Sequence, residues 1–269
     1  MLGFAETLGG TIASFIVPAA GGLLIISVAA KYLNAKYLAA FAIGLYLWFF
    51  SDTIGDANLL GANEGFSGGV FHAALWIAFA IGLTLMLTLD RDLFTPGPDG
   101  MKLGFAVPVL VAVAVGIHGF GEGAALSATA VTTPSTSLVD AFGGLSAGTA
   151  FVLHKALEPM MVGAAYWIYA KDHAKDVSGR IKDLSILVLA FTLPGIVGGA
   201  TAYYIVQAYP SVDFTYVFAL GLGTSIYAAA RLARGMFEGP RTSGTDSTKM
   251  ALMMLLGFTC LYLAALLHS

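Results

Sequence analysis

The sequence predicts an all-α polytopic membrane protein, organised as a single transmembrane domain over residues 1–269. Its composition, its long apolar runs and the placement of its positive charges each support this prediction. Of its residues, 58% are hydrophobic and 11% are charged, whereas an ordinary soluble domain is about 25% charged. A soluble protein of this composition would have too few polar side chains to cover its surface, so we expect a lipid bilayer around it.

Eight apolar stretches are long enough to cross the hydrocarbon core, for which about 20 mostly apolar residues are needed. They lie at roughly 10–30, 37–56, 68–89, 102–130, 139–169, 183–208, 213–233 and 249–267. We expect each to be a helix, because none shows the alternation of polar and apolar residues that a barrel strand requires. The sixth contains Pro194-Gly195, which predicts a bend or a close helix contact.

The positive charges alternate with these spans. Twelve of the thirteen Lys and Arg residues lie in the loops after the first, third, fifth and seventh spans, and the opposite face carries none. By the positive-inside rule the basic loops are cytoplasmic, so both termini are predicted to lie outside, and the plasma membrane is the expected location. The thirteenth, Lys155, lies within the fifth span.

The outward loop between the second and third spans is acidic. It carries Asp52, Asp56 and Glu64 and no Lys or Arg. Three carboxylates could form a negative vestibule that concentrates cations at an entrance. The alternative is a polar, glycine-rich loop that obeys the same charge bias as the other outward loops.

The fourth span contains His118 and Glu122, four residues apart. On a helix these positions lie on one face, one turn apart, and both side chains are ligands for borderline divalent metals. Gly119, Gly121 and Gly123 leave little side-chain bulk here, so a neighbouring helix can approach closely. The alternative for this motif alone is a structural hydrogen bond between His118 and Glu122.

The fifth span repeats the arrangement with His154 and Glu158, followed by Pro159. A short connection makes the fourth and fifth spans antiparallel neighbours, which places the two motifs at similar depth. Ionisable residues at membrane depth are costly and are read as functional by default. We therefore favour a metal site over a structural network, and the predicted ligands are His118, Glu122, His154 and Glu158.

Other polar residues are predicted to lie beside the metal site or on the path to it, and not to bind the metal ion within it. Lys155 points about 100° away from His154 around the helix, and it either snorkels to the surface or pairs with Glu122 or Asp140. Asp52 and Asp56 could guide ions inward, with Glu64 in the same loop. His72, in the third span, is interpreted as an interface histidine rather than a ligand.

The two motifs resemble those of the ZIP (Zrt-, Irt-like protein) metal transporters. That family typically carries His-Asn-x-Pro-Glu-Gly in its fourth span and His-Lys-x-x-Glu in its fifth, and has eight spans with both termini outside. The corresponding residues here are His118-Gly119-Phe120-Gly121-Glu122-Gly123 and His154-Lys155-Ala156-Leu157-Glu158. The resemblance covers the topology of the whole chain but only these two short motifs in sequence, so the chain looks like a divergent, minimal member.

Two departures from the family motifs affect the number of metal ions that the site could bind. Gly119 stands where the family has Asn, and Gly121 where it has Pro. In the family that Asn helps to bind metal, including a second ion, so its loss leaves the two His-Glu pairs with enough ligands for one ion. The chain also lacks the long His-rich loop that many members have between the third and fourth spans.

The resemblance implies a transporter rather than an enzyme, with a divalent metal ion as its substrate. The ion would be held at the midplane by the fourth and fifth spans and released toward the cytoplasm, as these helices move against the others. Zinc is the leading expectation, and the same ligand types also suit Fe²⁺, Mn²⁺, Co²⁺ and Cd²⁺. The expected partners are the lipid bilayer, the metal ions and a second copy in a homodimer, with no nucleic acid.

Two alternatives remain open from the sequence. The first is an intramembrane metal-dependent hydrolase, in which two His and a carboxylate hold zinc and a second Glu acts as base. The second is a membrane protein that binds metal in a structural or sensory role without transporting it.

Overall fold

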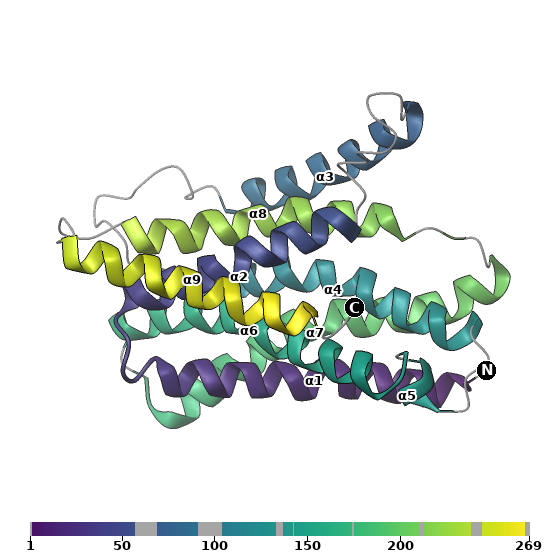
Figure 1. Ribbon diagram of the computed structural model, residues 1–269, viewed down its shortest axis with the longest axis horizontal. Helices are drawn as coiled ribbons and strands as arrows, with labels where there is room; N and C mark the ends of the chain where they lie inside the picture. The colour runs from purple at the N-terminus through teal and green to yellow at the C-terminus, as the bar shows by residue number, and fades with distance from the viewer. Residues whose placement is uncertain are drawn as a thin grey trace.

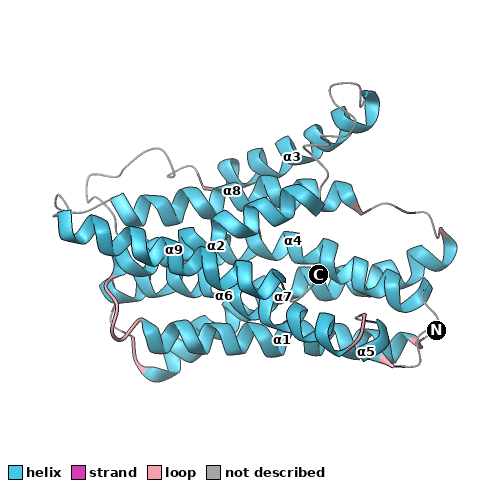
Figure 2. Cartoon of the chain, viewed as in Figure 1, coloured by secondary structure: helices cyan, strands magenta, loops and turns pink. Residues whose placement is uncertain are grey.

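In the computed structural model the chain forms a bundle of long helices, and Figures 1 and 2 show that helix is the regular element throughout the described part. The structure describes residues 2–56, 69–90, 104–132, 137–141, 143–173, 175–209, 212, 214–237 and 244–266. The prediction of an all-α protein is confirmed over these ranges.

A long helix lies at each of the eight predicted spans, and a single short turn of helix, α5, lies between two of them. The bounds are α1 (Phe4–Ala29), α2 (Ala35–Asp56), α3 (Gly69–Leu89), α4 (Ala106–Thr132), α5 (Leu138–Ala141), α6 (Leu145–Asp172), α7 (Val177–Ala208), α8 (Thr215–Phe237) and α9 (Gly244–Leu266).

Six of these helices are long and apolar enough to cross a membrane, namely α1, α2, α4, α7, α8 and α9. The chain is therefore a multi-pass membrane protein. In α3 the apolar stretch whose side chains are described, Ala73–Leu89, is shorter than the whole helix, and α6 is less apolar because it carries His154, Lys155 and Glu158. The count of eight spans stays a prediction.

The predicted fifth span, 139–169, is divided in the structure. The short helix α5 ends before Gly143 and Gly144, whose φ angles are 82° and 100°. Their N–H groups donate to the carbonyls of Asp140 and Val139, at 3.0 and 2.9 Å, and so end that helix. Only glycine adopts this left-handed backbone at little cost, so two consecutive glycines break the run and α6 begins at Leu145.

Glycines bring α4 and α7 into backbone contact. A Cβ atom at Gly123 would overlap the carbonyl oxygen of Gly195, and one at Gly198 would overlap that of Phe120. The close approach predicted for the glycines of both helices is confirmed here. Because α4 carries one His-Glu pair, this contact holds that pair firmly against α7.

We expect Gly123→Ala to destabilise the bundle by about 1–3 kcal/mol, because the added methyl group meets main chain that cannot rotate away. Gly21→Ala, on α1, is the matched control, since a Cβ there has no atom within 4 Å. Thermal unfolding of both variants in one detergent measures the difference. Equal melting temperatures would contradict the close contact between α4 and α7.

The helices pack as two groups, and most of the close glycine contacts lie within a group. The first group is α1, α4, α6 and α7, in which Gly22 of α1 also meets the carbonyl oxygen of Ala156 in α6. The second group is α2, α3, α8 and α9, in which Gly44 of α2 meets Met254 of α9 and Gly82 of α3 meets Leu220 of α8. The groups meet mainly where α8 packs against α4 and α2 packs against α6, and α3 lies at the edge against α8 (Figure 1).

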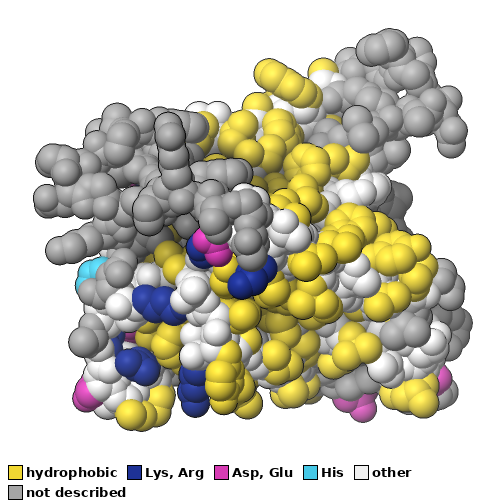
Figure 3. Space-filling view, turned by 60° about the vertical axis from the view of Figure 1, so that its left-hand side comes forward, with side chains coloured by type: hydrophobic (Ala, Val, Ile, Leu, Met, Phe, Trp, Pro, Cys, Tyr) yellow, Lys and Arg dark blue, Asp and Glu magenta, His cyan; other side chains and the backbone are white. Residues whose placement is uncertain are grey.

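The connections after α1 and α6, both predicted to be cytoplasmic, lie at one end of the bundle. Lys171 donates to the carbonyl oxygen of Leu33, which joins the end of α6 to the loop after α1. Lys36 pairs with Asp246 at 2.7 Å and joins the starts of α2 and α9. Between α6 and α7, a hydrogen bond to Asp183 raises the pKa of Lys175. Figure 3 shows Lys and Arg side chains gathered at one end of the visible face.

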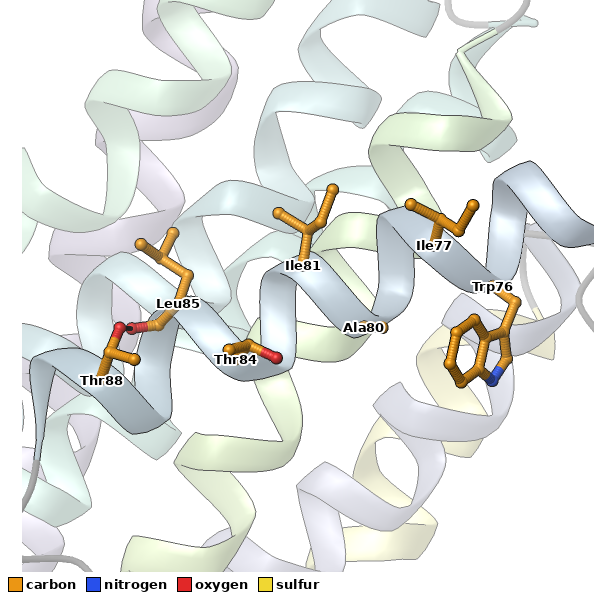
Figure 4. Close-up of a pocket in the computed structure, with 7 residues that line it drawn as sticks. All are labelled: Trp76, Ile77, Ala80, Ile81, Thr84, Leu85 and Thr88. Atoms are coloured by element: carbon orange, nitrogen blue, oxygen red, sulfur yellow. Dashed lines mark hydrogen bonds between the residues drawn. The ribbon is translucent and has the colours of Figure 1, made fainter.

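The flank of the bundle is apolar, as expected for contact with lipid. Hydrophobic side chains cover much of the face seen in Figure 3. On α3 a shallow groove of about 430 Å³ is lined by Trp76, Ile77, Ala80, Ile81, Thr84, Leu85 and Thr88 (Figure 4). Its lining has no charged group and no histidine, so this groove offers none of the usual side-chain ligands of a divalent metal ion.

Candidate metal site

Three of the four predicted ligands come together near the middle of α4 and α6, and the fourth, His154, lies beside Glu158. One ligand atom each of His118, Glu122 and Glu158 lies within 4.8 Å of the other two. The Nε2 atom of His154 lies 3.0 Å from Oε1 of Glu158, so His154 adjoins the cluster through Glu158. The side chains of His118 and Glu158 are buried, and that of Glu122 is 13% exposed. Packing of α6 against α4 thus brings both motifs to one place.

Lys155 lies inside this cluster with no exposed surface. Its Nζ atom forms an ion pair with Glu122 and donates to both carboxylate oxygens of Glu158, at 2.9 and 2.8 Å. Of the alternatives for Lys155, the pairing with Glu122 is confirmed. Snorkelling to the surface is wrong, because two carboxylates bind the ammonium group in the protein interior.

Two aromatic rings surround the ammonium group of Lys155. Its Nζ atom lies 5.1 Å from the ring centroid of Phe15 on α1 and 5.8 Å from that of Phe191 on α7. Rings at this distance stabilise a cation through their negative faces. Neither residue could be recognised from the sequence, because a phenylalanine within an apolar run carries no signal of a polar neighbour.

Charge in the cluster is nearly balanced. The two carboxylates and one ammonium group leave one net negative charge when both imidazoles are neutral. Burying such charges is costly unless they are paired, and here each carboxylate is paired with the same lysine. An ion that bound both carboxylates would have to take the place of the Lys155 ammonium group.

The histidines keep ring nitrogens available. His118 Nε2 lies 3.7 Å from Oε1 of Glu122, which is too long for a hydrogen bond, so the structural hydrogen bond considered for α4 is absent. Among the described residues, Nδ1 of His118 is buried without a hydrogen-bond partner, whereas Nε2 of His154 lies 3.0 Å from Oε1 of Glu158. An unpaired buried nitrogen requires an explanation in a native protein, and binding of a metal ion is one explanation.

The ring of His118 is held by aromatic contacts instead. Its centroid lies 4.7 Å from that of Phe49 on α2 and 5.3 Å from that of Phe218 on α8. The backbone of α4 at His118 also lies so close to Gly221 of α8 that a Cβ there would be 2.7 Å from the His118 Cα. The second helix group therefore orients this imidazole from two sides.

Of the residues predicted to support the site, Asp52 is the other one, besides Lys155, whose side chain the structure describes. Its Oδ2 atom is 3.8 Å from Nε2 of His154, and its side chain is 35% exposed. Asp56 and His72 belong to α2 and α3, but their side chains lie outside the described residues, and so does the whole of Glu64.

No family model matches the chain, and no curated protein matches it. The function of the site must therefore be inferred from the chemistry of its residues. Two imidazoles and two carboxylates form the ligand set that suits a borderline divalent ion in a protein, and Lys155 offers a competing cation.

Proposed function

We propose that the chain transports divalent transition metal ions, zinc foremost, from the outside toward the cytoplasm as a divergent ZIP-like protein. In this proposal eight helices cross the plasma membrane with both termini outside, and Fe²⁺, Mn²⁺, Co²⁺ and Cd²⁺ are further candidate substrates. The observation that carries it is the convergence of His118, Glu122 and Glu158 within 4.8 Å, with His154 beside them.

The depth of the cluster supports transport. His118 lies about halfway along the 27 residues of α4, and Glu158 about halfway along the 28 residues of α6. An ion held there is far from both membrane surfaces, so its ligands must replace its hydration shell. Two carboxylates can neutralise a dehydrated divalent ion, and the imidazoles add neutral ligands without further charge.

The surroundings of Gly119 support a single bound ion. A Cβ at this position would lie 3.8 Å from Oε2 of Glu122 and 3.9 Å from Nζ of Lys155. The asparagine of the resembled family would thus extend toward the region that the lysine ammonium group occupies. The ammonium group of Lys155 lies in the region where a second metal ion would need ligands. This position of a positive charge favours a mononuclear site.

Lys155 also supplies a means of release. It neutralises Glu122 and Glu158 when no ion is bound, so the empty site remains compatible with burial. A metal ion would displace the ammonium group on binding, and the return of the ammonium group would favour release. Such competition lowers affinity, which a transporter needs so that the ion can leave.

The two helix groups support an alternating movement. Both motif helices belong to the first group, in which glycines bring main chains together. They meet the second group through Phe49 and Phe218, which pack against His118, and through Gly221, which lies close to the His118 backbone. We infer that the first group moves as a unit past the second and carries the ion with it.

A buried ion-pair network without metal is the second candidate, and the contacts of Lys155 favour it. An ammonium group that forms ion pairs with two carboxylates can stabilise the buried cluster without a metal ion. The hydrolase alternative has less support, because both carboxylates are paired with Lys155 and neither is left as a base.

Zinc uptake into proteoliposomes tests the proposal. We expect uptake by the native chain and none by the double variant His154→Ala, Glu158→Ala, because this change removes an imidazole and a carboxylate from the ion. His173→Ala is the matched control, since that imidazole stacks on Tyr169 at the end of α6, away from the cluster. Failure of the native chain to bind or take up Zn²⁺ would favour the ion-pair network.

A further inference from the structure

Asp52 is the acidic residue that reaches the cluster from the second helix group. It lies on α2, whereas the four predicted ligands and Lys155 lie on α4 and α6. Within the described ranges its ion pair is with His154, and it forms none with Lys or Arg. The Asp52 carboxylate and the Glu158 carboxylate therefore face the same imidazole nitrogen of His154 from two different helices.

Exposure decreases step by step from Asp52 into the cluster. The side chain of Asp52 is 35% exposed, that of His154 is 8% exposed, and that of Glu158 is fully buried. The separations along this path are 3.8 Å from Asp52 to His154 and 3.0 Å from His154 to Glu158. Asp52 lies one turn before the end of α2 that leads into the acidic outward loop, so the path begins at the predicted outer side.

The distance between Asp52 and His154 suits a shared ion. Zinc lies about 2.0–2.2 Å from carboxylate oxygen and imidazole nitrogen, so two ligands of one tetrahedral ion are about 3.4 Å apart. The observed 3.8 Å between Oδ2 and Nε2 therefore needs only a small adjustment. The same Nε2 atom faces Glu158, and one nitrogen cannot bind two ions at once.

We propose that Asp52 and His154 form an outer cation subsite, which takes a divalent metal ion from the outside and passes it to Glu158. This subsite rests on the proposed transport function. His154 stays bound to the ion while its carboxylate partner changes from Asp52 to Glu158. Because Asp52 belongs to the second helix group, movement of the first group would separate His154 from it and commit the ion to the inner site.

The test compares initial rates of Zn²⁺ uptake into proteoliposomes over a range of Zn²⁺ concentrations. We expect Asp52→Asn to raise the half-saturating concentration about tenfold, the loss that follows removal of a supporting residue at a metal site, and to leave the maximal rate nearly unchanged. Asp52→Glu should restore most of the loss. Asp140→Asn is the matched control. It removes an exposed carboxylate on the predicted outer side, which accepts a hydrogen bond from the Ser137 hydroxyl on the short connection before α6.

A change of metal preference separates a ligand from a structural residue. In Asp52→Cys a soft thiolate would replace the hard carboxylate beside His154. We expect the half-saturating concentration for Cd²⁺ to fall relative to that for Mn²⁺, a shift that loss of a structural contact would not produce. Thermal unfolding of each variant checks that the fold is retained.

The outcomes separate this subsite from the transport function. If the native chain takes up Zn²⁺ and Asp52→Asn behaves like the native chain and Asp140→Asn, the outer subsite is wrong and the transport function stands. If Asp52→Cys leaves the preference between Cd²⁺ and Mn²⁺ unchanged, Asp52 is not a ligand. If the native chain neither binds nor takes up Zn²⁺, the transport function fails and the subsite fails with it.

Discussion

Replacement of Lys155 by methionine should increase Zn²⁺ affinity on the order of a hundredfold or more. In the native protein the ammonium group binds both carboxylates of the cluster. A positive charge about 4 Å from the metal ion would weaken its binding by about 4 kcal/mol at the effective dielectric constant of a protein site. Each 1.4 kcal/mol corresponds to about a tenfold change in affinity. Calorimetric titration of the purified protein with Zn²⁺ measures the change.

The same substitution should make stability depend on metal. Without the ammonium group, Glu122 and Glu158 are left unpaired near one another in the protein interior, and breaking a buried ion pair costs about 3–5 kcal/mol. We therefore expect Lys155→Met to melt well below the native protein in chelator and to recover when Zn²⁺ is added. A native-like melting temperature in chelator would contradict the pairing.

Lys155→Arg provides the control for this prediction. It keeps the positive charge and the two hydrogen-bonded carboxylates, so affinity should stay low and melting should depend little on metal. If Lys155→Met and Lys155→Arg bound Zn²⁺ equally, Lys155 would not compete with the ion, and the release mechanism would be wrong.

Replacement of Glu158 by glutamine should reduce Zn²⁺ binding by at least about a hundredfold and abolish uptake. Glu158 is fully buried and contacts His154 and Lys155. Its loss leaves one carboxylate, which Lys155 still neutralises, so little negative charge remains to hold a dehydrated divalent ion. The protein should still fold, because Glu122 keeps the ammonium group paired. Titration calorimetry and uptake measure the two effects.

Glu6→Gln serves as the matched control for this variant. Glu6 lies in the first turn of α1, where its carboxylate accepts a hydrogen bond from the N–H of Gly3, so the change removes the same charge far from the cluster. Unchanged Zn²⁺ affinity in Glu158→Gln would show that Glu158 is not a ligand.

The sequence predicts the helical architecture well, but it predicts the positions where helices are interrupted less well. Continuous apolar runs predict helices because a backbone in lipid must satisfy its own hydrogen bonds. The predicted run at 139–169 nevertheless contains Gly143 and Gly144, whose left-handed backbone ends α5. Glycine is frequent in this chain, and the sequence does not distinguish glycines that break a helix from glycines such as Gly123, which bring two helices together.

The candidate ligands could also be predicted, because spacing along a helix is a local property. His118 and Glu122, and likewise His154 and Glu158, share one helix face whatever surrounds them. Their convergence depended on one further inference, that the two helices are antiparallel neighbours. The contacts of Asp52 and Phe15 with the cluster come from α2 and α1, and no spacing rule connects residues on separate helices.

By itself, the sequence determined a multi-pass helical membrane protein with two buried His-Glu pairs, because composition and helical periodicity are encoded locally. Only the tertiary structure decided what Lys155 does. Its position on α6 leaves several directions open, and the choice depends on Glu122, which comes from another helix, and on the rings that close around the ammonium group. A buried charge adopts the partner that packing brings to it, and packing is a property of the whole bundle.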